Sequence, residues 1–234
     1  MPNEWSVPFV GREEELSIIR EHLQAWGTRC VIFIVGGGGI GKTRLLNEVG
    51  VQFSGLPKIS LKIPAIIDFD DDRYKFRDNV KFALARQIDA SVFTPYFEAF
   101  HDLRLTEEQW DDANVSIVTR KATAAERAFI ESFNIVLRKS RIVLRFDTTD
   151  AVSLNDSLVL KYLFDMVTQL ENIVMLVAGR NADEIYEQVK NDLGRNAILV
   201  QLPPFESTDS HTYLKYKQQA MKVAISDEEW LEKL

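Results

Sequence analysis

Apolar residues are arranged along the chain in two alternating patterns: short runs, and longer stretches in which they recur at helical spacing. The short runs predict five buried strands, over residues 31–35, 59–69, 141–146, 173–178 and 197–202. The longer stretches predict helices over residues 13–26, 42–52, 76–88, 122–139, 157–170, 183–190 and 208–223, with a further helix starting at Ser226. Residues 91–112 are rich in aromatic side chains, and we expect them to be irregular and packed.

This alternation predicts the fold class: an α/β domain in which a five-stranded, mostly parallel sheet lies between helices. In sheets of this kind, ligands bind outside the carboxyl ends of the strands. The turns that follow the first, third and fourth predicted strands are therefore the first places to search for functional side chains.

The turn after the first strand is rich in glycine. Residues 36–43 read GGGGIGKT, which fits the phosphate-loop pattern G-x-x-x-x-G-K-S/T and indicates a P-loop NTPase. Glycines allow successive backbone N–H groups to face an anion, and the positive end of the following helix points at the same place. In this pattern Lys42 reaches the β- and γ-phosphates, and the Thr43 hydroxyl binds Mg²⁺. The predicted nucleotide-binding residues are Gly37, Gly38, Gly39, Ile40, Gly41, Lys42, Thr43 and Arg44.

The third strand ends at an acidic residue, Asp147. In P-loop NTPases an acid at this position holds Mg²⁺ directly or through water, so Asp147 and Thr43 are the predicted metal ligands. The alternative is that an aspartate merely ends the strand. Hydrolysis also requires a group that orients or deprotonates water. Position 148 carries Thr148, and the nearest acid is Asp150, for which a catalytic and a structural role both stay open.

Two arginines accompany these strand ends. Arg180 follows the fourth strand, where a positive group could touch the γ-phosphate and report its presence; a surface arginine that opens a loop is the alternative. The predicted catalytic set is therefore Lys42, Asp147, Asp150 and Arg180. Arg145 lies within the third strand and alternates onto the same face as Asp147, although central parallel strands are usually apolar. Either Arg145 pairs with an acid, or this strand is less buried than expected.

An acidic run follows the second predicted strand and comprises Asp68, Asp70, Asp71 and Asp72. These carboxylates could form a metal site, but a solvated loop is the simpler interpretation. The aromatic stretch that comes next could stack on nucleic acid if basic residues were interleaved with it. Its neighbours are acidic, which favours packing instead.

Composition limits the remaining possibilities. The chain has 234 residues and a net charge of −7, which disfavours a broad nucleic-acid-binding surface. No stretch approaches the roughly 18 apolar residues of a membrane span, and residues 1–9 lack the pattern of a secretory signal. The single cysteine, Cys30, cannot form an intrachain disulfide and is expected to be a small buried residue. We therefore expect a cytoplasmic protein with no membrane partner, and nucleic acid is disfavoured as a partner.

The order of these motifs resembles that of the signal-transducing STAND class of P-loop ATPases, relatives of the AAA+ proteins that include the NB-ARC and NACHT groups. The resemblance is carried by FVGRE with EL over 9–16, the phosphate loop, IVLRFD with its DxxD-like continuation over 142–150, LVAGR over 176–180 and ILVQLPPF over 198–205. It extends over about residues 9–220, although residues 70–135 match no familiar pattern.

The resemblance implies that residues 9–12 wrap the adenine, with Val10, Gly11 and Arg12 binding the nucleotide, and that Arg180 is the sensor arginine. It implies a nucleotide-binding domain over 1–205 and the beginning of a helical lid over 206–234. In this class a winged-helix domain completes the lid, so we expect the chain to be part of a longer protein. Such proteins are switches: ADP holds a closed monomer, and exchange for ATP permits opening, self-oligomerisation and contact with protein partners through further domains.

Thr148 departs from this pattern, because an acid often follows the metal-binding aspartate. The sequence therefore predicts an ATP- or ADP-binding switch with slow Mg²⁺-dependent hydrolysis. Two alternatives stay open: an origin-recognition-type ATPase that acts on DNA, which would need a basic surface, and a binding-only module, which Thr148 and Arg145 favour. A GTPase is disfavoured because the chain contains no N-K-x-D or T-K-x-D sequence. A small-molecule kinase is disfavoured because no lid-like arginine cluster follows the third strand.

Overall fold

The computed structural model describes residues 7–55, 59–108, 115–152 and 158–221. The chain divides into two compact units. The larger unit is Glu15–Leu202, and the described residues of the smaller unit are 7–14 and 203–221. The two units are described separately below. The predicted helix from Ser226 lies outside the described residues, and the predicted domain boundary after residue 205 stays a prediction.

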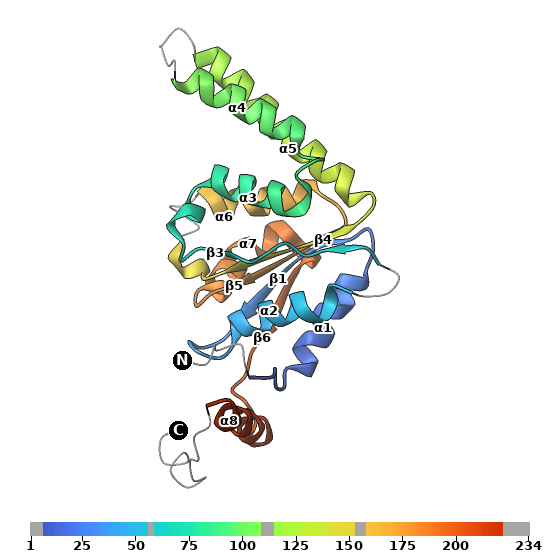
Figure 1. The fold of residues 1–234 in the computed structure, drawn as a ribbon, viewed down its shortest axis with the longest axis vertical. Helices are drawn as coiled ribbons and strands as arrows, with labels where there is room; N and C mark the ends of the chain where they lie inside the picture. The colour runs from blue at the N-terminus through green and yellow to red at the C-terminus, as the bar shows by residue number, and fades with distance from the viewer. Residues whose placement is uncertain (1–6, 56–58, 109–114, 153–157, 222–234) are drawn as a thin grey trace. The chain divides into compact units, whose positions relative to one another are not determined.

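The larger unit is built on one parallel sheet, which confirms the predicted α/β class. Its strands are β1 (Arg29–Val35), β2 (Leu61–Lys62), β3 (Ile67–Asp68), β4 (Arg141–Asp147), β5 (Ile173–Ala178) and β6 (Ala197–Gln201). They lie in the order β2-β4-β5-β1-β6, and β3 also pairs with β4 (Figure 1). Every pairing is parallel. The strand that precedes the phosphate loop therefore lies between β5 and β6, and β5 separates it from β4.

The second predicted strand, over residues 59–69, is not continuous. It forms two short pieces, β2 and β3, which both pair with β4. Pro64 lies between the pieces, and a proline cannot donate a backbone hydrogen bond to a neighbouring strand. The expected strand position therefore exists, but the pairing is interrupted where the N–H is missing.

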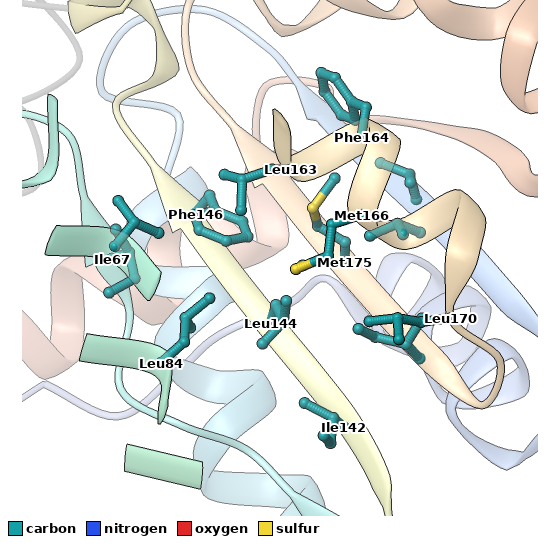
Figure 2. Close-up of a cluster of buried hydrophobic side chains, with 14 of the residues drawn as sticks. Ile67, Leu84, Ile142, Leu144, Phe146, Leu163, Phe164, Met166, Leu170 and Met175 are labelled. Carbon is teal, nitrogen blue, oxygen red and sulfur yellow. The ribbon is translucent and has the colours of Figure 1, made fainter. Parts of the chain in front are cut away.

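Helices cover both faces of the sheet (Figure 1). One face is covered by α1 (Glu13–Gln24) and α2 (Lys42–Phe53), and the other by α3 (Arg77–Asp89), α5 (Val115–Leu137), α6 (Leu158–Gln169) and α7 (Ala182–Leu193). Alternation along β4 separates the two sides. Ile142, Leu144 and Phe146 point into the large apolar cluster against α6 (Figure 2). Arg145 and Asp147 point to the opposite side, where α2 lies.

The expectation that residues 91–112 are irregular is wrong, because α4 (Thr94–Glu108) is a helix. Pro95 falls in its first turn, where a missing N–H is tolerated. The helix has weak amphipathic character and buries only Tyr96 and Leu103 from its own sequence. It packs beside α5, with Tyr96 in an edge-to-face contact with Phe129 at 4.9 Å between ring centroids. Packing against the next helix, rather than a pattern within its own sequence, thus stabilises this element.

A buried polar cluster closes the amino end of β4. Arg141 is fully buried, and its guanidinium donates to the carbonyl of Thr28 at 3.0 Å and to that of His22 at 2.9 Å. It also donates to the side-chain oxygens of Asn172, at 2.9 Å, and Thr28, at 3.1 Å. Asn172 has a positive φ of 61° and donates in turn to the carbonyls of Leu137 and Ser140. This network ties the ends of α1, α5 and β4 together.

Cys30, near the start of β1, is buried and unpaired, as the sequence predicts. Burial raises the pKa of its thiol to about 11, so the thiol stays protonated at neutral pH.

Candidate functional site

The phosphate loop joins β1 to α2 in the backbone shape that the motif requires. Gly39 and Gly41 have φ values of 75° and 101°, in the left-handed region that side chains disfavour. Gly41 directly precedes α2, so the positive end of this helix faces the loop. A Cβ atom built on Gly37, Gly39 or Gly41 would meet nothing within 4 Å. The loop therefore borders open space on these sides, which is the room that a phosphate group needs.

Lys42, the first residue of α2, folds its side chain back across the loop. Its Nζ atom donates to the carbonyl oxygen of Gly36 at 2.7 Å and to that of Gly37 at 2.9 Å. The ammonium group is thus already held beside the loop that precedes it. The predicted role of Lys42 as the phosphate-binding cation fits this position.

Thr43 and Asp147 lie together, as predicted for the Mg²⁺ ligands. The Thr43 hydroxyl hydrogen-bonds the Asp147 carboxylate, and the backbone N–H of Thr148 donates to Asp147 Oδ1 at 2.9 Å. Asp147 is only 4% exposed, and this burial is the main reason why its pKa is raised. Hydroxyl and carboxylate oxygens are the donors that Mg²⁺ prefers, with waters and substrate phosphates completing its shell. The residues present therefore fit the ion.

Arg180 and Asp150 are joined by a hydrogen bond. The backbone N–H of Arg180 donates to Asp150 Oδ1 at 2.9 Å, which links the turn after β5 to the short 3-10 helix Thr149–Ala151 after β4. The Arg180 side chain extends towards the phosphate loop, because a Cβ atom built on Gly38 would lie 4.0 Å from its Nε atom. The structure thus gives Asp150 a positioning contact and brings Arg180 beside the loop.

The charges that act on Lys42 come from the other three residues of the predicted catalytic set. Burial is the main influence on the pKa of Lys42 and lowers it. The carboxylates of Asp147 and Asp150 oppose this shift, and the guanidinium of Arg180 adds to it. The side chains that follow the carboxyl ends of β1, β4 and β5 therefore lie close together at one edge of the sheet, as parallel-sheet topology predicts.

Sequence reasoning missed the small residues that join the turns after β4 and β5. Thr149 is fully buried, and its hydroxyl donates to the side-chain oxygen of Asn181 at 3.0 Å. Gly179 lies so close that a Cβ atom there would collide with the Thr149 hydroxyl, and its nearest backbone neighbour, Thr149 N, would lie at 2.9 Å. The only sequence signal is the glycine itself, between a buried strand and Arg180.

Arg145 is explained by neither of the two expectations. It is buried, at 7% exposure, and it forms no salt bridge with any acid in the described ranges. Its guanidinium donates to the carbonyl oxygens of Leu46, at 2.8 Å, and Pro64, at 2.6 Å. The expectation of an acidic partner or an exposed strand is therefore wrong, because backbone carbonyls of α2 and of the β2–β3 connection accept its hydrogen bonds. A Cβ atom on Gly50 would collide with this guanidinium.

The acidic run does not behave as one group. Asp71 and Asp72 form surface ion pairs with Arg73 and Lys75, and Asp70 is exposed, as a solvated loop predicts. Asp68 differs, because it ends β3 and is the register partner of Asp147 in β4. Among the described residues, no group of three or more His, Cys, Asp and Glu side chains could hold a metal. The position of Asp68 beside Asp147 could not be read from the run.

The remaining predicted nucleotide contacts are Arg44, Val10, Gly11 and Arg12. Arg44 is half-buried in the first turn of α2. The other three belong to the smaller unit, which also contains α8 (Ser207–Met221). There Gly11 adopts a φ of 67° and a Cβ on it would lie 2.6 Å from an Asp209 carboxylate oxygen. The Arg12 guanidinium stacks 4.6 Å from the centre of the Phe205 ring. Their predicted contacts with adenine stay a prediction.

Three features define a P-loop nucleotide-binding site: a glycine-rich loop between a strand and a helix, a lysine folded over the loop, and a threonine of that helix hydrogen-bonded to the aspartate that ends β4. In agreement, the family model described as an AAA ATPase domain matches residues 8–177. The chain therefore belongs to this family of ATPase domains. The match includes the phosphate loop, Asp147 and Asp150, and it ends before Arg180. No curated protein matches the chain. Within the described residues, no helix is long and apolar enough to cross a membrane.

Proposed function

We propose that this ATPase domain is a nucleotide-controlled switch of the STAND class, with slow Mg²⁺-dependent ATP hydrolysis. ADP stabilises a closed state, and exchange for ATP permits a change of conformation, self-oligomerisation and binding of protein partners.

The observation that carries this proposal is the position of Arg180. Its side chain lies beside Gly38 of the phosphate loop, while its backbone is held by Asp150 in the turn that follows the metal-binding strand. A cation in this place can contact a γ-phosphate. A shift of Arg180 would also move Asp150, because the two residues are joined by a hydrogen bond. Binding that differs between ATP and ADP in this way is what a nucleotide-controlled switch requires.

Slow turnover is supported by the residue after Asp147. Thr148 has no carboxylate, and its backbone, with a φ of 53°, donates to the Asp147 side chain. A site that binds ATP well and hydrolyses it slowly keeps its triphosphate state long enough to signal. The same feature supports a second candidate, a binding-only module in which hydrolysis is lost.

The test begins with the nucleotide that copurifies with the protein. We would denature one sample of the protein and identify the released nucleotide by chromatography. A second, folded sample from which nucleotide has been removed would then be titrated with ATP, ADP and GTP in the presence of Mg²⁺. Bound ADP, adenine preference and slow single-turnover hydrolysis are expected for the switch. Equal affinity for ATP and ADP would overturn the switch, and ATP that stays intact would favour the binding-only module.

A further inference from the structure

The turn after β4 does not offer an evident acid for activating water. Position 148 is a threonine. Asp150 is exposed and lies on the 3-10 helix beyond the end of β4, not in the sheet beside Asp147, and its carboxylate holds the backbone N–H of Arg180. Asp147 is hydrogen-bonded to Thr43 and suited to the metal. If the domain hydrolyses ATP, as proposed above, the carboxylate that receives the water's hydrogen bond comes from another element.

The neighbouring strand supplies one. Asp68 ends β3 and is paired in register with Asp147 in β4. Partners in a parallel pair have their side chains on the same side of the sheet, and neighbouring strands lie roughly 4.8 Å apart. Asp68 therefore projects on the side where Asp147 meets Thr43. The two carboxylates are also close enough for Asp68 to contribute to the raised pKa of Asp147.

Asp68 also differs from the acids next to it in how it is satisfied. Asp71 and Asp72 are neutralised by Arg73 and Lys75 at the surface. The carboxylate of Asp68 is half-buried and accepts one hydrogen bond, from the backbone N–H of Asp70 to Oδ1 at 3.0 Å. Within the described part of the chain it forms no salt bridge. A half-buried carboxylate without a cation, beside the metal-binding aspartate, retains its capacity to accept a hydrogen bond from water.

We propose that Asp68 is a catalytic residue that orients the attacking water for hydrolysis of ATP. The water oxygen forms a bond to the γ-phosphorus while the bond from that phosphorus to the β–γ bridging oxygen breaks. The electron pair of the broken bond stays on the bridging oxygen of ADP. One proton of the water passes through the Asp68 carboxylate to the released phosphate. Asp68 thus takes the part that an acid at position 148 would otherwise play.

The experiment compares Asp68→Asn with Asp70→Asn, a matched removal of one exposed acid from the same run. Asparagine retains an oxygen that can accept the Asp70 N–H, so the turn after β3 is preserved, and a thermal melt checks this. Three quantities are measured for each variant: affinity for ATP with Mg²⁺ by calorimetry, single-turnover hydrolysis, and the nucleotide that stays bound after incubation with ATP. General-base groups typically contribute 10²- to 10⁴-fold to the rate.

We expect Asp68→Asn to slow hydrolysis by about 100-fold, to keep ATP affinity within about threefold of wild type, and to retain intact ATP. Asp70→Asn should match wild type in all three measurements. Asp68→Glu, which restores an acid, should recover part of the rate. If Asp68→Asn hydrolyses ATP at the wild-type rate, this proposal is overturned and the proposed function is unaffected. A loss of Mg²⁺-dependent ATP affinity would also overturn it, because Asp68 would then be a metal ligand. Absence of hydrolysis by the wild-type protein would instead overturn the hydrolytic part of the proposed function.

Discussion

The two ends of β4 both bury charge, but they satisfy it in opposite ways. At the amino end, Arg141 donates four hydrogen bonds to groups of the protein itself. At the carboxyl end, Asp147 is also buried, yet the contacts of its carboxylate are a hydroxyl and one backbone N–H. Burial raises the pKa of Asp147, so the ionised carboxylate is disfavoured in the nucleotide-free protein.

This difference separates stability from binding along a single strand. At the amino end, both terminal nitrogens of the Arg141 guanidinium are satisfied by groups of the protein, and removing any member leaves buried groups without partners. The carboxyl end retains unneutralised charge that a metal ion and phosphates can complement. Substitutions at the two ends should therefore affect different measurements, and the following predictions test that separation.

The largest effect is expected from Arg141→Leu. The change leaves the carbonyls of His22 and Thr28 buried without their donor, at about 1–3 kcal/mol each, so we expect a loss of about 3–4 kcal/mol in the free energy of unfolding. The midpoint of thermal unfolding should fall by roughly 10 °C. Urea unfolding measures the loss, and calorimetry at low temperature should find the ATP affinity of the folded protein unchanged. A loss below 1 kcal/mol would mean that the amino end does not stabilise the fold.

Lys42→Ala should have the converse signature. Removing the ammonium that lies across the phosphate loop should weaken ATP binding by at least about 100-fold, or about 2.7 kcal/mol, because a charge-assisted contact is lost. The free energy of unfolding should change little. Isothermal titration calorimetry measures the affinity, with Lys139→Ala, a change to an exposed lysine, as the control. Unchanged ATP affinity would rule out the site.

Asp147→Asn tests the effect of the buried, ionised carboxylate on both binding and stability. We expect Mg²⁺-dependent ATP binding to weaken by about tenfold, or about 1.4 kcal/mol, since a metal ligand is lost. The nucleotide-free protein should become more stable at pH 7, because the pKa of Asp147 is raised in the folded state and the ionised form is therefore unfavourable above it.

The sign of the pH dependence follows from the same shift. As pH falls through the raised folded-state pKa, the wild-type protein takes up a proton and gains stability that the variant does not gain. The difference in unfolding free energy between the two proteins should narrow as the pH is lowered from 7 through the raised pKa of Asp147, as urea unfolding over a series of acidic pH values can measure. A variant less stable than wild type at pH 7 would contradict the comparison.

Arg180→Ala should have the smallest effect. Because Arg180 lies beside the loop rather than within it, the substitution should reduce the ratio of ATP to ADP affinity by roughly fivefold, or about 1 kcal/mol. Calorimetry with each nucleotide gives the ratio, and Arg180→Lys, which retains the charge, should preserve most of it. If alanine and lysine leave the ratio equally intact, Arg180 does not sense the γ-phosphate.

Local patterns were sufficient to predict the parts of this fold that are regular and locally determined. The positions of β1, β4, β5 and β6 follow from apolar runs, and the phosphate loop follows from glycines whose backbone angles Gly39 and Gly41 confirm. The helix α4 could not be predicted, because its apolar residues do not form one continuous stripe along the helix. Packing against α5 stabilises it instead. The break between β2 and β3 is encoded by Pro64, which lies inside the apolar stretch that predicts a single strand.

The positions of site residues could be predicted where each belongs to a recognisable motif. They could not be predicted where a contact joins residues that lie far apart in the sequence. Lys42 and Thr43 open the helix after the phosphate loop, and Asp147 and Arg180 lie at the ends of the expected strands, while their roles stay predictions. Arg145 was recognised as anomalous, but its acceptors are carbonyls of residues 46 and 64, which no side-chain pattern reveals. The pairing of Asp68 with Asp147 depends on sheet register, which becomes visible only once β3 is placed.

The contact between Gly179 and Thr149 has a consequence for how this sequence can diverge. A side chain at position 179 would occupy the space of the Thr149 hydroxyl and press on its backbone N–H. The two positions are therefore not independent in evolution: a residue larger than glycine at 179 requires a smaller residue at 149 or a different path for the turn after β4. In a library randomised at both positions and selected for nucleotide binding, substitutions at 179 should survive only together with changes at 149.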